Sequence, residues 1–123
     1  MLKEQSNVRQ EPKDHFRRWF AQEDFSLYIW YNRDGGFHGF QICYDELDDP
    51  RAFTWTEDRG YSHRGIDTGE RHLVQHKGTP ILVPNDNFDA DQVYARLCAT
   101  DHDLPPDIRD FVRVKFTAYL SSR

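Results

Sequence analysis

The sequence is poor in several features that would mark a particular class of protein. Only two of its 123 residues are cysteine, Cys43 and Cys98, and they form no C-x-x-C pair. This favours reduced thiols in a reducing compartment over a disulfide framework. No run approaches the roughly 18 apolar residues of a membrane-spanning helix, and the polar opening MLKEQSNVRQEPKD has no apolar signal core. We therefore expect a cytoplasmic protein that has no membrane segment.

Positive charge is scarce as well, and it is dispersed. The 16 Lys and Arg residues are scattered among 21 Asp and Glu residues, which gives a formal net charge of −5. Duplex DNA is bound by clustered positive charge, so DNA is not expected as a partner. The acidic balance also disfavours single-stranded RNA stacked on aromatic side chains. The glycine-bearing stretch GGFHGF fits a hairpin turn better than a phosphate loop.

Aromatic residues, in contrast, are abundant. They make up 15% of the chain, although hydrophobic residues reach only 37%. We therefore expect a core built from a few large side chains. The length suits one domain that buries a core without disulfides. Residues 1–11 show no periodicity and are expected to form a disordered or loosely ordered tail, and residues 12–123 a single domain.

Alternating side chains predict successive β-hairpins. In the clearest of them, aromatic and β-branched residues alternate on both sides of Asn32 to Gly36, a turn segment that tolerates positive φ. Two further pairs are separated by Asp58 to Gly60 and by Lys77 and Gly78. The three predicted pairs are 25–31 with 37–44, 51–57 with 60–67, and 71–76 with 79–84.

Helical signals lie at both ends of the domain. Near the N-terminus, Phe16, Trp19 and Phe20 follow the i, i+3, i+4 spacing of one helical face, with Pro12 suited to the first turn. This pattern predicts a short amphipathic helix.

Two more helices are predicted in the last third of the chain. Asp89 followed by Gln92 is a variant of the capping box, so a helix should begin at Asp89. After Pro105 and Pro106, a broad apolar stripe predicts the last helix. The whole order indicates an α+β domain: an antiparallel β-meander of about five to six strands, with one N-terminal helix and two C-terminal helices.

Several stretches resemble a family of small, uncharacterised bacterial proteins. They are RRWF, LYIWYNRDGGFHGFQICYD, TWTEDRGYSHRGIDTGE and TPILVPN, in that order, over roughly residues 17–87. The resemblance implies a single cytosolic domain of bacterial origin, and it implies no activity, cofactor or catalytic residue.

The segment 61–76 raises the question of a metal site, because it holds three of the six histidines. His72 and His76 would share a strand face with Cβ atoms about 13 Å apart, too far for one zinc ion. Asp67 and Gly69 suit a turn, which would pair Tyr61–Ile66 with residues 71–75 and bring Arg64 near His72. We therefore predict no preformed tri-histidine metal site, and no cofactor is indicated. A site that combines His63 with Asp67 or His72 stays open as an alternative, since catalytic zinc uses three protein ligands.

An enzyme is the alternative interpretation. It would be a small hydrolase-like acid/base enzyme centred on His63, with Asp67 and Glu70 as partners. Cys43 is a candidate nucleophile, but His38 lies five residues away on the same strand and hence on the opposite face. Its partner would have to come from another strand, such as His63.

The leading hypothesis is a non-enzymatic domain that binds a small ligand or a protein partner. Aromatic residues at alternate strand positions, with arginine and histidine beside them, can form a sheet face for a planar or anionic ligand. The same residues would serve the sheet core if both faces were buried, and a homodimer is left open. The candidate ligand-binding residues are Tyr28, Trp30, Trp55, Tyr61, His63 and Arg64, next to Arg51.

Overall fold

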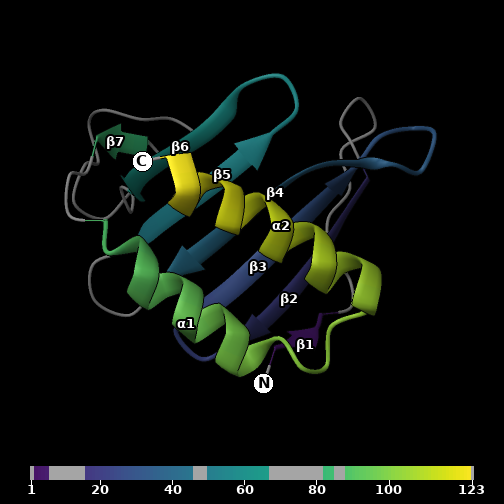
Figure 1. Ribbon diagram of the computed structural model, residues 1–123. Coiled ribbons are helices and arrows are strands. Elements are labelled where there is room, and N and C mark those ends of the chain that lie inside the picture. The colour runs from purple at the N-terminus through teal and green to yellow at the C-terminus, as the bar shows by residue number, and fades with distance from the viewer. Residues whose placement is uncertain (1, 6–15, 46–49, 67–81, 85–87, 123) are drawn as a thin grey trace, which may run out of the picture.

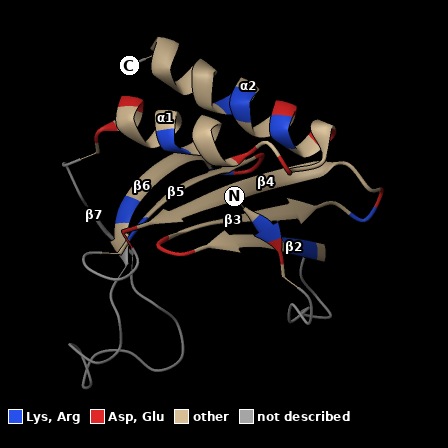
Figure 2. Ribbon diagram, turned by 90° about the horizontal axis from the view of Figure 1, so that it is seen from below, with Lys and Arg blue, Asp and Glu red and all other residues tan. Residues whose placement is uncertain are grey.

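A seven-stranded antiparallel sheet with two helices on one face makes up the computed structural model (Figures 1 and 2). The structure describes residues 2–5, 16–45, 50–66, 82–84 and 88–122. The strands follow one another in chain order, so the sheet is a meander, and the α+β prediction is confirmed. The strands are β1 (Lys3–Glu4), β2 (Phe16–Gln22), β3 (Phe25–Tyr31), β4 (Phe37–Tyr44), β5 (Arg51–Thr56), β6 (Gly60–Ile66) and β7 (Leu82–Pro84), and the helices are α1 (Ala90–Thr100) and α2 (Pro106–Ser122).

Two of the predicted hairpins are confirmed. β3 pairs with β4 across Asn32 to Gly36, where the Gly35 backbone N–H donates to the Asn32 carbonyl at 2.9 Å and Gly35 has φ +91°. β5 pairs with β6, and Gly60 has φ +73°. Glycine is favoured at both turns because the left-handed region costs it nothing.

The predicted N-terminal helix is wrong. The residues of that pattern form β2, which pairs with β3 along its whole length. As a strand, the segment places Phe16, Arg18 and Phe20 on one face, and Phe20 is buried in the core. The Arg18 guanidinium lies 5.2 Å from the centre of the Phe20 ring, so this charged residue also covers apolar surface. Pairing with a neighbouring strand has outweighed the helical spacing.

The beginning of the chain adds a short edge strand. Within the segment predicted to be a loose tail, β1 pairs with β2, and Leu2 is buried. The Leu2 backbone N–H donates to the Thr100 carbonyl at the end of α1. Residues 2–5 therefore join the sheet and the core, and residues 6–11 of that segment lie outside the described part.

The third predicted hairpin is only partly testable. Residues 71–76 lie outside the described residues. On the edge away from β5, β6 pairs with β7. This pairing sets Arg64 opposite Pro84 and Ile66 opposite Leu82. The predicted pairing of Arg64 with His72 involves a residue outside the described part of the chain.

Both C-terminal helices are confirmed. The Asp89 side chain accepts the Gln92 backbone N–H at 3.2 Å and caps α1, as its sequence predicted. Both helices lie across the same face of the sheet (Figure 2). Helix α2 begins at Pro106 and buries Ile108, Val112 and Phe116, which recur every four residues.

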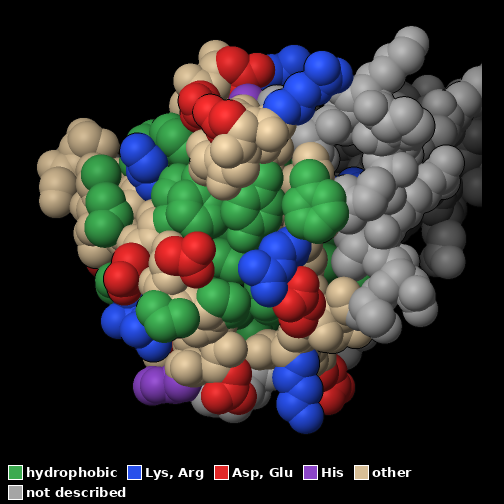
Figure 3. Space-filling view, turned by 90° about the vertical axis from the view of Figure 1, so that its right-hand side faces the viewer, with side chains coloured by type: hydrophobic (Ala, Val, Ile, Leu, Met, Phe, Trp, Pro, Cys, Tyr) green, Lys and Arg blue, Asp and Glu red, His purple; other side chains and the backbone are tan. Residues whose placement is uncertain are grey.

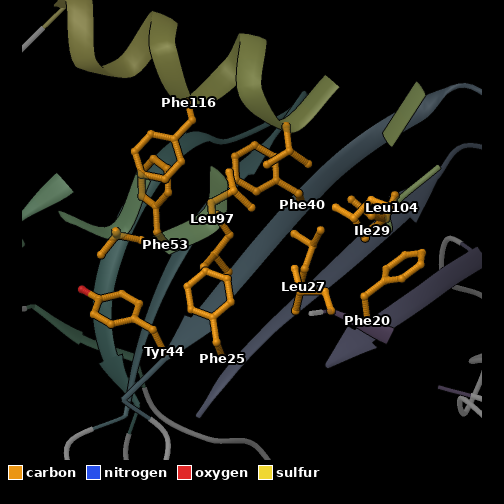
Figure 4. Close-up of a cluster of buried hydrophobic side chains, with 14 of the residues drawn as sticks. Phe20, Phe25, Leu27, Ile29, Phe40, Tyr44, Phe53, Leu97, Leu104 and Phe116 are labelled. Carbon is orange, nitrogen blue, oxygen red and sulfur yellow. The ribbon is translucent and has the colours of Figure 1, made fainter. Parts of the chain in front are cut away.

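The core lies between this face and the helices. Its largest side chains come from alternate positions of β2 to β5 and from the inner sides of α1 and α2 (Figure 4). No described helix is long and apolar enough to cross a membrane. The fully buried aromatic residues are Phe25, Phe40, Phe53 and Phe116.

Candidate ligand-binding site

The strand register divides the predicted site residues between the two faces of the sheet. Phe53 is buried under the helices and pairs with His63, and Trp55 pairs with Tyr61 two residues along. These side chains therefore share the helix-covered face. The face that neither α1 nor α2 covers, which we call the opposite face, carries the other three residues. They are Tyr28, Trp30 and Arg64.

Trp55 and Tyr61 support the fold beneath α2. The Lys115 ammonium lies 4.3 Å from the centre of the Trp55 ring, and the Tyr61 hydroxyl donates to the Lys115 carbonyl at 2.6 Å. Burial raises the pKa of Tyr61. Both rings therefore fasten α2 to the sheet, and the expected single surface with Tyr28 and Trp30 does not form.

His63 lies among aromatic rings at the other end of this face. Its ring stacks on Phe88 at 3.9 Å between centroids, with 8° between the planes. Its Nε2 lies 2.5 Å from the Tyr44 hydroxyl. Burial raises the pKa of Tyr44 to about 12. The side chain of His63 is thereby held by both a ring contact and a hydrogen bond.

A cavity of about 140 Å³ opens beside this pair, at the start of α1. Its walls come from the end of β4, the start of β5 and one side of α1. It combines two guanidinium groups with two carboxylates, a phenol and an amide. The described residues that line it are Tyr44, Asp45, Arg51, Asp89, Gln92, Val93 and Arg96.

Arg96 fixes the shape of this cavity. Its Nη1 donates to the Asp45 carboxylate at 3.1 Å, and its Nη2 donates to the Asp24 carbonyl at 3.3 Å. Asp24 and Asp45 are the two described non-glycine residues with positive φ, at 66° and 53°. The guanidinium also lies 5.0 Å from the centre of the Phe25 ring. One α1 side chain therefore holds the β2–β3 turn and the end of β4 in place.

The predicted acid/base groups are not brought together in the described part. Asp67 and Glu70 lie outside the described residues. Cys43 pairs with Ser26 and Ala52, which places it on the opposite face, whereas His63 is on the helix-covered face. A Cys43–His63 pair is therefore excluded by the register.

His38 has other partners. It lies 3.6 Å from Glu57 and 3.5 Å from Asp58, both at the β5–β6 turn. Among the described residues, no three His, Cys, Asp or Glu side chains are grouped so as to hold a metal ion.

The opposite face carries an aromatic pair of its own. Trp19 and Tyr28 face each other across β2 and β3, and their rings are parallel within 1° at 5.7 Å. The Trp19 indole nitrogen is buried and meets no hydrogen-bond acceptor in the described part of the chain. Trp30 and Arg17 form the next cross-strand pair. Predicted residues Tyr28 and Trp30 thus belong to a second surface.

Apolar side chains also gather on one side of the molecule, with acidic and basic side chains around them (Figure 3). A row of ring contacts crosses from the sheet to α2: Phe16 to Tyr31 at 6.0 Å, Tyr31 to Phe37 at 5.3 Å, and Phe37 to Phe111 at 4.2 Å. Phe16 is 57% exposed. This row of rings extends from the packed side chains beneath α2 to the exposed Phe16 at the surface.

Sequence reasoning included Arg51 beside the candidate residues but missed Asp45 and Arg96. Asp45 follows a predicted strand directly, and aspartate tolerates positive φ, which was a weak local signal. Nothing in the sequence indicated that Arg96 would reach it from 51 positions away.

The family resemblance over residues 17–87 stays a prediction, and the site has to be interpreted from its own geometry. Comparison with family models, with curated proteins and with solved structures finds no match to this chain.

Proposed function

We propose that the protein is a non-enzymatic binding domain that takes a small polar ligand into the cavity beside Tyr44. The cavity itself is the observation that carries this proposal: charged groups of both signs line a space of about 140 Å³. Ligand pockets combine a concave shape with a few convergent polar groups, and those for drug-sized ligands measure about 300–1,000 Å³. This smaller cavity therefore suits a small ligand.

Two features favour binding over catalysis. A general base works best when its pKa is near the working pH. Tyr44 has a pKa of about 12, so its phenol stays protonated at neutral pH, and the His63 nitrogen beside it is occupied by that hydroxyl. Arg96 is held by its bonds to Asp24 and Asp45 and keeps the wall rigid. A preformed wall lowers the ordering cost of binding.

We place this activity in the cytosol. Cys43 and Cys98 are not joined in a disulfide, which fits a reducing compartment. The bacterial origin that the family resemblance implies also stays a prediction.

A fragment screen by ¹H–¹⁵N NMR on the full chain tests the proposed site. We expect small charged fragments to shift the backbone amides of Asp45, Gln92 and Val93, and Arg51→Gln to remove these shifts. Arg109→Gln is the matched control, since Arg109 lies on α2 outside the cavity. Shifts that survive Arg51→Gln, or a screen that never moves these amides, would refute the proposal.

The opposite face is the second candidate, for a planar ligand or a protein partner. The parallel Trp19–Tyr28 pair and the buried indole nitrogen of Trp19 favour it, because an unsatisfied buried donor costs about 1–3 kcal/mol. The chain has three tryptophans, and only Trp55 is on the helix-covered face. Binding at the opposite face should shift the indole signals of Trp19 and Trp30 and leave Trp55 unchanged. Equal shifts of all three would argue against this surface.

A further inference from the structure

We infer that the ligand of the cavity is a small zwitterion, with an ammonium and a carboxylate a few bonds apart, as in a free α-amino acid. This inference rests on the proposed function and specifies its ligand. It starts from the charges of the described lining: Arg51 and Arg96 are balanced by Asp45 and Asp89. A ligand with one charge would bring an unmatched group against two like charges, whereas a dipolar ligand matches both signs.

The two carboxylates can receive the ammonium. One oxygen of Asp45 accepts the Arg96 guanidinium at 3.1 Å, and one oxygen of Asp89 accepts the Gln92 backbone N–H at 3.2 Å. A carboxylate has two oxygens and about four lone-pair sites, so each of these groups keeps acceptor capacity. An ammonium has three donors to distribute between them.

The opposite charge of the ligand has matching donors. The Arg51 guanidinium lines the same cavity and carries N–H donors in a planar fork. Guanidinium binds carboxylate through two parallel hydrogen bonds.

The cavity size limits the rest of the ligand. About 140 Å³ has room for the two charged groups and a short side chain, and Val93 is the one aliphatic residue among the described lining. A compact amino acid therefore fits better than a large one.

Isothermal titration calorimetry on the full chain tests this ligand class. The probes are alanine, serine and glutamine, each beside its N-acetyl derivative, which lacks the ammonium, and its amide, which lacks the carboxylate. We expect at least one free amino acid to bind and both derivatives to bind at least tenfold more weakly. Binding that is equal for a free amino acid and its N-acetyl form would overturn the inference.

Asp89→Asn provides the matched variant, since asparagine caps a helix as well as aspartate but carries no charge. We expect at least tenfold weaker binding of the amino acid and an unchanged melting temperature. Asp91→Asn, on the same first turn but outside the lining, should leave affinity unchanged.

If no amino acid binds while other fragments shift the Asp45 and Gln92 amides, the ligand class is wrong and the proposed site stands. If neither kind of probe shifts them, both are wrong.

Discussion

Asp101 and Arg113 join the end of α1 to the middle of α2 through two parallel hydrogen bonds. The Arg113 Nε and Nη2 atoms each lie 2.7 Å from an Asp101 carboxylate oxygen. Asp101 is completely buried, whereas the Arg113 side chain is 36% exposed. The buried carboxylate therefore depends on one guanidinium that still reaches water.

Replacing one partner should be costly. We expect Arg113→Met to lower the free energy of unfolding by about 3–5 kcal/mol, because it leaves a buried charge without its cation. Chemical denaturation measures this. Arg109→Met is the control, since Arg109 has only a 3.9 Å contact with the exposed Asp110 and should cost below about 1 kcal/mol. Equal effects of the two substitutions would contradict this account.

Gly39 is needed for close packing of β4 on β5. A Cβ atom at this position would lie 2.3 Å from the Trp55 carbonyl oxygen and 2.9 Å from the Thr56 Cα. Backbone cannot move aside as a side chain can, so Gly39→Ala should destabilise the protein by about 1–3 kcal/mol. Gly36→Ala meets only the flexible Asp34 side chain, at 3.2 Å, and should cost less. Thermal melts of the two variants give the comparison, and a neutral Gly39→Ala would refute the prediction.

Phe53 is the central ring of the core. It contacts Phe116 at 4.7 Å and Phe88 and Tyr119 at 4.9 Å, and it is fully buried. Phe53→Ala should cost about 3–5 kcal/mol through lost burial and the cavity that remains. The same substitution at Phe16, which is 57% exposed, should cost far less. Urea denaturation of both variants tests whether burial decides the difference.

Tyr44 should make stability depend on alkaline pH. Its pKa rises from the ordinary 10.0 to about 12 in the folded protein, so folding keeps a proton that the unfolded chain loses. The contribution is complete below pH 10 and is lost as the pH rises towards 12, by roughly 2 kcal/mol. The difference in unfolding free energy between the natural protein and Tyr44→Phe should change across this range. A difference that stays constant up to pH 12 would show that the pKa of Tyr44 is not raised in the folded protein.

The sequence predicted those elements whose signals are local. The β3–β4 turn at Gly35 and the α1 cap at Asp89 depend on neighbouring residues, and both were predicted correctly. The segment of Phe16 and Phe20 satisfies strand alternation and helical spacing together. Its pairing with β3 decided the outcome, and that pairing is not visible in a short window.

The candidate site was predicted less well for the same reason. Strand alternation within β3 places Tyr28 and Leu27 on opposite faces of the sheet. Which face carries Trp55 and Tyr61, however, follows from the register across several strands. A shift of one residue would reverse their orientation. The contact of Arg96 with Asp45 joins residues of α1 and β4 that only the assembled fold brings together.

The meander has a consequence for the growing chain. Each strand pairs with the one made just before it, so the hairpins can form in the order of synthesis. The apolar surface of Phe25, Phe40 and Phe53 has no cover, however, until α1 and α2 have been translated. Until then an aromatic sheet face is open to other nascent chains, and such exposed surface promotes aggregation. Ribosomes that stall before Ala90 should therefore carry an intermediate that associates with other chains. The last third of the chain acts as an intramolecular chaperone for the sheet, because α1 and α2 cover its aromatic face.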